Sequence, residues 1–123
     1  MPMRKTTLVL GASNNPERFS CKAIMSLKRE MIPVIAVGRR ESSLGDIRIR
    51  KGMPSDIKGI HTITLYLSAK FQKEYYDYIL SLKPRRIIFN PGTANPELEQ
   101  IAVKHGIEVV SDCMLVMIGQ GRF

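Results

Sequence analysis

The sequence contains no tryptophan, only two cysteines and no long run of apolar residues. A membrane-spanning helix needs roughly 20 consecutive apolar residues, so we expect no membrane segment and no membrane partner. The N-terminal stretch MPMRKTTLVLGAS lacks the long hydrophobic region of a secretory signal. Cys21 and Cys113 have neither metal-ligand spacing nor the density of a disulfide framework. The sequence therefore predicts a cytoplasmic protein with reduced thiols and no metal site.

Aromatic residues are also scarce, at 7% of the chain, whereas the net charge is +8. The charge is uneven: residues 1–60 contain twelve Lys and Arg against five Asp and Glu, and residues 61–123 contain seven against six. Such a basic half fits a solvated face, a nucleic-acid patch or the complement of a polyphosphate ligand. Because aromatics are few and no recognition motif is present, nucleic-acid binding ranks last and we expect no nucleic-acid partner.

Short apolar runs and amphipathic stretches alternate along the whole chain. Buried strands are expected at 6–10, 34–37, 62–67, 86–89 and 108–110, and Ile47 and Ile49 allow a further short half-exposed strand. Helices are expected at about 20–30 and 71–82 and after Asn95-Pro96, with a short final helix after Asp112. Gly106 fits the end of the third helix.

This alternation is typical of an α/β protein with a parallel sheet and right-handed crossovers. We predict one Rossmann-like domain over residues 1–123, with three layers and a doubly wound sheet. The prediction gives the sheet about five strands in the order 3-2-1-4-5, so that the strand at 62–67 is third and adjoins the second.

Ligands of such sheets bind beyond the carboxyl ends of the strands, where the strand order reverses. Three loops leave strands there, at residues 11–18, 38–41 and 90–94, and each contains a glycine near its strand. Glycine at this position allows a sharp turn or a close approach to a ligand.

The first loop resembles a phosphate-binding turn without the complete dinucleotide fingerprint. In the pattern G-x-G-x-x-G, the second and third glycines after Gly11 would fall at Ser13 and Pro16. The loop nevertheless offers backbone N–H groups, the hydroxyls of Ser13 and Ser20, and a helix N-terminus to an anion. An ordinary loop with a helix-capping serine is the alternative interpretation.

The second loop discriminates between cofactors. Arg39 lies 28 positions after Gly11, consistent with a βαβ unit of about 30 residues. A protein that selects NAD usually has an acidic residue here, whereas Arg39 and Arg40 suit a phosphate on the ribose. NADP and coenzyme A both carry a phosphate on the ribose, so both are possible cofactors. A solvated arginine pair without a ligand is the third alternative.

Candidate catalytic groups are few. His61 precedes a strand, His105 lies near a helix C-terminus, and Cys21 lies near a helix start. No paired carboxylates, metal ligands or nucleophile–base pair can be named. We expect no catalytic residue and leave enzymatic activity open.

The segment GASNNPERFS at residues 11–20 resembles the opening motif of the small CoA-binding domain proteins, whose fold is similar to the CoA-binding domain of the succinyl-CoA ligase alpha subunit. The resemblance continues through the amphipathic helix, the second strand, the NPGTAN loop at 90–95 and the VVSDCM segment at 109–114. It therefore spans essentially the whole chain. The sequence departs from the family at Val37-Gly38-Arg39, where the family has a V-N-P-like turn, and at residues 65–68, which lack the usual arginine-containing strand end.

The resemblance implies coenzyme A, or an acyl-CoA, as the cofactor of a non-catalytic or accessory binding protein. Its phosphates would contact the first loop, its adenosine the second, and the third loop would form the opposite wall. The cofactor-binding residues expected in this way are Gly11, Ala12, Ser13, Asn15, Pro16, Arg18, Ser20, Val37, Gly38, Arg39, Arg40, Asn90, Pro91 and Gly92. The alternatives are an NADP-dependent oxidoreductase and a basic nucleic-acid-binding module. A homodimer or an unknown protein partner stays open.

Overall fold

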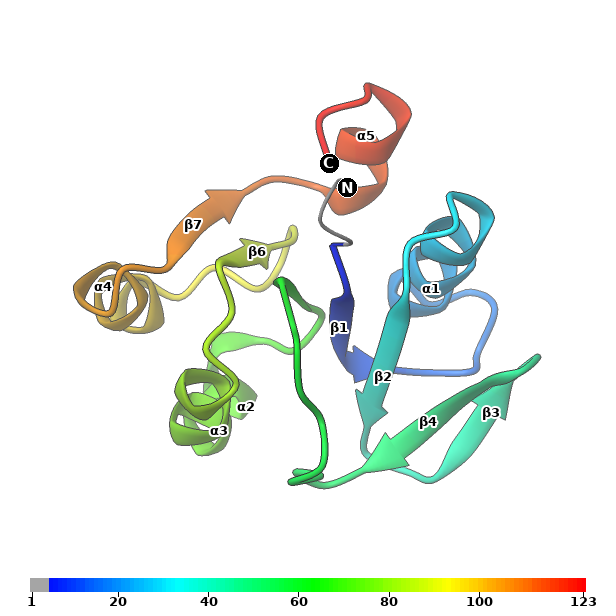
Figure 1. Cartoon of the computed structure of the whole chain (residues 1–123), viewed down its shortest axis with the longest axis horizontal. Coiled ribbons are helices and arrows are strands. Elements are labelled where there is room, and N and C mark those ends of the chain that lie inside the picture. Colours follow the sequence, from blue (N-terminus) through cyan, green and yellow to red (C-terminus); the bar gives the residue numbers. More distant parts are fainter. Residues whose placement is uncertain (1–4) are drawn as a thin grey trace.

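A seven-stranded sheet forms the centre of the computed structural model, which describes residues 5–123 (Figure 1). The strands are β1 Thr7–Ala12, β2 Val34–Gly38, β3 Ser42–Leu44, β4 Ile47–Lys51, β5 Thr62–Leu65, β6 Arg86–Phe89 and β7 Glu108–Ser111. They are ordered β3-β4-β2-β1-β5-β6-β7, and all neighbouring pairs are parallel except the antiparallel β3–β4 edge. β5 and β6, like residues 7–10 of β1, are buried, as strands covered on both faces must be.

Helices cover both faces of the sheet. They are α1 Phe19–Arg29, α2 Ala69–Gln72, the 3₁₀ turn η1 Lys73–Tyr75, α3 Tyr76–Ser81, α4 Pro96–Lys104 and α5 Met114–Gly119. On one face, α1 and α5 pack Ile24, Leu27 and Met114 against β1, β2 and β6. On the other, Ile79 of α3 and Leu98 of α4 close a second core. Each fully buried side chain of this size contributes about 1.5–3 kcal/mol relative to exposure.

The predicted fold class is therefore confirmed, and the strand count and order need correction. The strand at 62–67 was expected beside β2, but β5 pairs with β1 on the side away from β2. The place beside β2 belongs to β4, where Ile49 is 1% exposed. The Ile47–Ile49 alternation therefore marks a true strand, and the unexpected β3 pairs with it as a hairpin edge.

The expected helix at 71–82 is divided into α2, η1 and α3. Its interruption coincides with Gln72, which is completely buried and donates to the main-chain oxygens of Leu67 and Thr93 at 2.7 and 2.8 Å. The predicted cap of α4 is confirmed, because the Asn95 side chain accepts a hydrogen bond from the Leu98 N–H at 3.2 Å and Pro96 follows it. No helix within residues 5–123 is long and apolar enough to cross a membrane.

Candidate functional site

A cleft of about 1200 Å³ opens at the carboxyl edge of the sheet, between the loops that follow β1, β2, β5 and β6. Its lining includes most of the residues expected from the sequence, although the loops are far apart along the chain. They are Gly11, Ala12, Ser13, Asn15, Arg18, Ser20, Arg39, Arg40, Asn90, Pro91 and Gly92. These loops lie close together because the strands are parallel, so that their carboxyl ends share one edge of the sheet.

The loop after β1 is shaped by two successive side-chain turns. The Ser13 hydroxyl accepts a hydrogen bond from the Asn15 N–H at 3.1 Å, and the Asn15 carboxamide oxygen accepts one from the Glu17 N–H at 3.0 Å. Gly11, with φ +95°, lets the chain leave the strand where a Cβ would lie 3.0 Å from the carbonyl carbon of Tyr66. Short polar side chains thus build a turn for which the dinucleotide fingerprint uses further glycines.

The N-terminus of α1 opens into the cleft without a cap. Its N-cap residue is Arg18, no side chain accepts from the first turn, and that turn contains no acidic residue. The N–H groups of Phe19 and Ser20 precede any intrahelical acceptor. Ser20 lies in this first turn, lines the cleft and is only 4% exposed. A helix start of this kind attracts an anion.

Three expected residues lie outside the cleft lining. Val37 is completely buried in β2, and Pro16 lines a separate groove beside α1. Gly38 is buried where β2 passes close to β1, so that a Cβ there would lie 2.3 Å from the Ala12 carbonyl oxygen. This close approach explains why glycine occupies the position.

An arginine–aromatic pair bridges two walls of the cleft. The Arg39 guanidinium carbon lies 4.5 Å from the centroid of the Phe71 ring, and Lys70 Nζ lies 4.9 Å from it. Phe71 is 38% exposed, although it is a large apolar residue. Arg39 was expected from the sequence, whereas Phe71 was not. Its position near the start of the helix that follows a central strand was the available signal.

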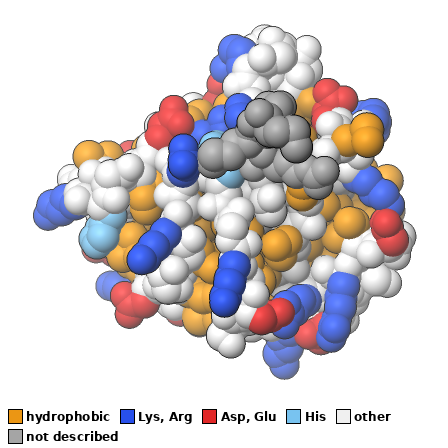
Figure 2. Space-filling view, viewed as in Figure 1, with side chains coloured by type: hydrophobic (Ala, Val, Ile, Leu, Met, Phe, Trp, Pro, Cys, Tyr) orange, Lys and Arg blue, Asp and Glu red, His pale blue; other side chains and the backbone are white. Residues whose placement is uncertain are grey.

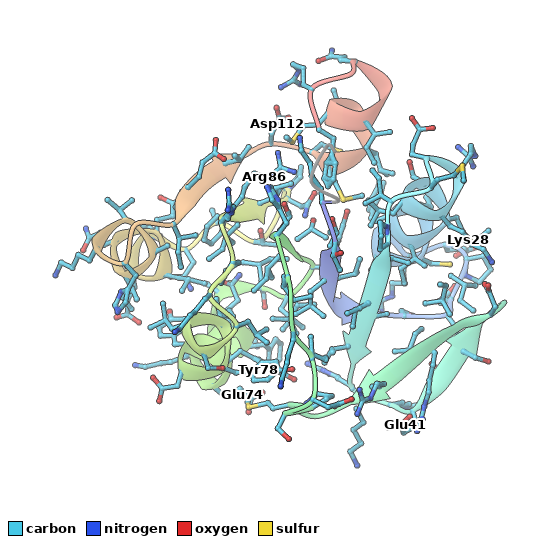
Figure 3. The ribbon with its side chains drawn as sticks, in the orientation of Figure 1. Lys28, Glu41, Glu74, Tyr78, Arg86 and Asp112 are labelled. Atoms are coloured by element: carbon cyan, nitrogen blue, oxygen red, sulfur yellow. The ribbon has the colours of Figure 1, made fainter. Side chains whose placement is uncertain are left out.

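Glu41 is the carboxylate nearest to the arginine pair in the sequence. Its side chain is hydrogen-bonded to residues of the β3–β4 hairpin. It accepts hydrogen bonds from the Lys51 N–H at 3.2 Å and from Arg48 Nε at 3.3 Å. These bonds, that of Lys51 foremost, hold the pKa of Glu41 below its ordinary value. Figure 3 shows Glu41 at the β3–β4 side of the sheet, far from Arg86. Glu41 therefore stays charged and engaged with its own hairpin.

Hydrogen bonds of the buried Asn90 side chain fix the wall of the cleft that residues 90–93 form. The Asn90 side chain donates to the Thr64 hydroxyl at 2.7 Å and to the Leu65 carbonyl at 2.9 Å, and it accepts from the Met114 N–H at 2.9 Å. It thus joins β5, β6 and the start of α5 while leaving no side-chain atom free. Pro91 and Gly92 are exposed and face the cleft. Asn90 positions this wall.

One end of the cleft is formed by Tyr66, Cys113 and Leu115, which were not expected as site residues from the sequence. Burial raises the pKa of the Tyr66 hydroxyl, which stays neutral at ordinary pH. Cys113 is half-buried at the start of α5, and its N–H donates to the Asp112 carboxylate at 2.7 Å. The resemblance at residues 109–114 pointed to this segment without assigning it a role.

The basic excess of the first half is partly neutralised elsewhere on the surface. Arg50 pairs with Asp56 at 2.8 Å, Arg48 with Glu41 at 3.3 Å, and Lys28 with Asp46. Figure 2 shows Lys and Arg side chains mixed with acidic ones over the region of β3 and β4. Among residues 5–123, no ion pair involves Arg18, Arg39 or Arg40, whose charges remain available to the cleft.

The chain is similar to a family model and to several solved structures. The family model described as CoA binding domain matches residues 5–119. The crystal structure of an uncharacterized protein is similar over 97% of this chain and 98% of that chain, with 44% sequence identity and a TM-score of 0.93.

Two more distant structures share the fold. The protein cell-free ID.343 from Thermus thermophilus is 23% identical over 98% of this chain and 91% of that chain, with a TM-score of 0.85. A hypothetical protein from Pyrococcus horikoshii OT3 is 23% identical over 96% of this chain and 83% of that chain, with a TM-score of 0.84. No curated protein matches. On the family match, the chain belongs to the CoA binding domain family.

Proposed function

We propose that this member of the CoA binding domain family binds coenzyme A or an acyl-CoA in the cleft at the carboxyl edge of its sheet. The observation that carries the proposal is the uncapped start of α1, which opens into the cleft at the nearly buried Ser20. The diphosphate binds there, receiving hydrogen bonds from the first N–H groups of α1, from Ser20 and from Arg18.

The adenosine end binds toward Arg39, Arg40 and Phe71. The Phe71 ring supplies a face on which a purine stacks, and the arginines attract the phosphate on the ribose. An NAD-selecting protein needs a free carboxylate at this point. Glu41 does not supply one, since Arg48 and Lys51 already engage it.

The protein acts in this proposal as a binding or accessory component rather than as a catalyst. Besides its basic residues, the cleft lining contains the titratable side chains of Glu17, Glu41, Tyr66 and Cys113. In the described residues, no hydrogen bond joins two of these four groups as a nucleophile and its base. The exposed Arg39 and Arg40 also favour a second candidate, an NADP-dependent oxidoreductase, because a 2′-phosphate suits them as well as a 3′-phosphate does.

Titration calorimetry with CoA, dephospho-CoA, NADP and NAD tests the proposal. CoA is expected to bind most tightly and to lose roughly tenfold in affinity when its ribose phosphate is absent, as one charged hydrogen bond would give. Equal affinities for CoA and dephospho-CoA would remove the role of Arg39 and Arg40. NADP binding far above CoA would favour the oxidoreductase, and no binding of either would refute the site.

A further inference from the structure

A second depression, a groove of about 620 Å³, lies between α1 and α5, the two helices that cover one face of the sheet. Its apolar lining consists of Pro16, Cys21, Met25, Leu115 and Ile118, and its other lining residues are Lys22, Ser26, Arg29, Glu30 and Gly119. Met25 is 44% exposed, which is high for an apolar side chain in the middle of a helix that packs on a sheet. The groove therefore presents apolar surface that the described chain leaves uncovered.

The groove continues from the cleft. Leu115 lines both depressions, and the two helices that form the groove begin at the cleft, α1 next to Ser20 and α5 next to Cys113. Figure 1 shows α1 and α5 as neighbours on one side of the sheet. Leu115 is therefore the residue at which the cleft and the groove adjoin.

We propose that this groove receives the acyl chain of an acyl-CoA, an inference that rests on the proposed function. With the adenosine at Arg39 and Phe71 and the diphosphate at α1, the pantetheine arm extends toward Cys113 and Leu115. The thioester then lies at the mouth of the groove, and the chain attached to it follows α1 away from the cleft.

The dimensions and side chains of the groove suit such a chain. From Cys21 to Arg29, α1 rises about 12 Å at 1.5 Å per residue, which fits an acyl chain of medium length. Met25 has an unbranched, flexible thioether that adapts to a chain without fixed shape. Lys22 Nζ lies 5.1 Å from the centroid of the Phe19 ring, at the N-terminus of α1. The Lys22 charge therefore contacts that ring.

The test compares CoA, acetyl-CoA and octanoyl-CoA by titration calorimetry on the whole chain. Because each buried methylene favours binding, octanoyl-CoA should bind about tenfold or more tightly than acetyl-CoA. Met25→Gln should reduce this advantage roughly three- to tenfold, since it places an amide in the apolar groove, and it should leave the affinity for CoA unchanged. Met53→Gln is the matched control, since Met53 is 45% exposed and lies outside the groove.

Equal affinities for octanoyl-CoA and acetyl-CoA, or equal effects of the two glutamine variants, would overturn the acyl groove while leaving CoA binding in place. Failure to bind CoA in any form would overturn the proposed function together with the groove. Sedimentation velocity of the unliganded protein adds a separate outcome. A dimer that Met25→Gln dissociates and Met53→Gln does not would assign the groove to a second copy of the chain and overturn the proposal.

Discussion

The two edges of the sheet both carry arginines, and they use them differently. At the amino edge, Arg86 is 6% exposed, donates to the Thr62 hydroxyl and to the Phe123 main-chain oxygen at 3.0 Å each, and stacks 4.5 Å from the Phe123 ring. At the carboxyl edge, Arg18 and Arg39 are exposed and make no ion pair within the described residues. Figure 3 shows Arg86 away from the Glu41 side of the sheet, where the cleft lies.

The charge of Arg86 therefore has a structural role, whereas the charges of Arg18 and Arg39 are available to a ligand. Burial lowers the pKa of Arg86, and its second terminal nitrogen has no partner in the described chain, so its environment disfavours the charge it holds. Such a group persists because its remaining bonds join β5, β6 and the end of the chain. Arg39 also stacks 4.5 Å from the Phe71 ring, but the side chains of Arg18 and Arg39 make no hydrogen bond or ion pair within the described residues. Their substitution should therefore alter binding more than folding.

The strongest test of the structural edge is Arg86→Leu. Removing the guanidinium takes one donor from the Thr62 hydroxyl, which keeps its contact with His61, and one from the Phe123 oxygen, which keeps that with Lys5. Because two buried hydrogen bonds of a charged group are lost, we expect a loss of about 3 kcal/mol in the free energy of unfolding. Denaturant unfolding measures this loss, and calorimetry should find CoA affinity unchanged at temperatures where the variant is folded. Arg85→Leu, at the exposed neighbouring residue, is the control and should leave stability within about 0.5 kcal/mol. Equal stability of the two variants would contradict the assignment.

The corresponding test of the carboxyl edge is Arg18→Ala. A charged hydrogen bond to the diphosphate contributes roughly 1.5–3 kcal/mol, so CoA affinity should fall about tenfold or more while the melting temperature stays constant. Arg85→Ala serves as the control on the other edge. A loss of stability equal to the loss of binding would make Arg18 a structural residue like Arg86 and would erase the distinction.

A smaller effect is expected from Phe71→Leu, which keeps an apolar side chain and removes the ring. Base stacking on an aromatic side chain contributes roughly 1–3 kcal/mol, and leucine retains part of it, so CoA affinity should fall about fivefold. Phosphopantetheine, which lacks the base, should bind the variant and the wild type equally. If its affinity falls by the same factor, Phe71 shapes the cleft as a whole instead of contacting the base.

The smallest effect concerns the pH dependence of stability at the amino edge. Burial, followed by the charge of Arg86, lowers the pKa of His61 below its ordinary value of 6.5. The unfolded chain therefore binds a proton more readily than the folded one, and stability falls as the pH drops through 6.5 toward the folded pKa. His61→Asn should lose less stability between pH 8 and pH 5.5 than the wild type in urea unfolding. The exposed His105→Asn should retain the wild-type dependence, and an identical slope for His61→Asn would refute this explanation.

The sequence allowed most of the cleft to be foreseen because its loops are local features. Gly11 near the end of β1, the polar turn from Ser13 to Glu17 and the helix that follows lie within twenty residues of one another. The Asn95-Pro96 helix start is equally local, since the cap bonds a residue three positions away. Whether residues 11–18 bind phosphate, and whether residues 1–123 act as one domain, stay predictions.

The sequence by itself determined the alternation of strands and helices, the parallel sheet and the edge at which its loops gather, because hydrophobic periodicity and turn residues act over short stretches of chain. Only the tertiary structure decided that β4 takes the place beside β2, that Glu41 is engaged by Arg48 and Lys51, and that Phe71 lies against Arg39. Each of these depends on which strands become neighbours. Strand pairing is set by the packing of distant segments into a common core, and no local pattern encodes it.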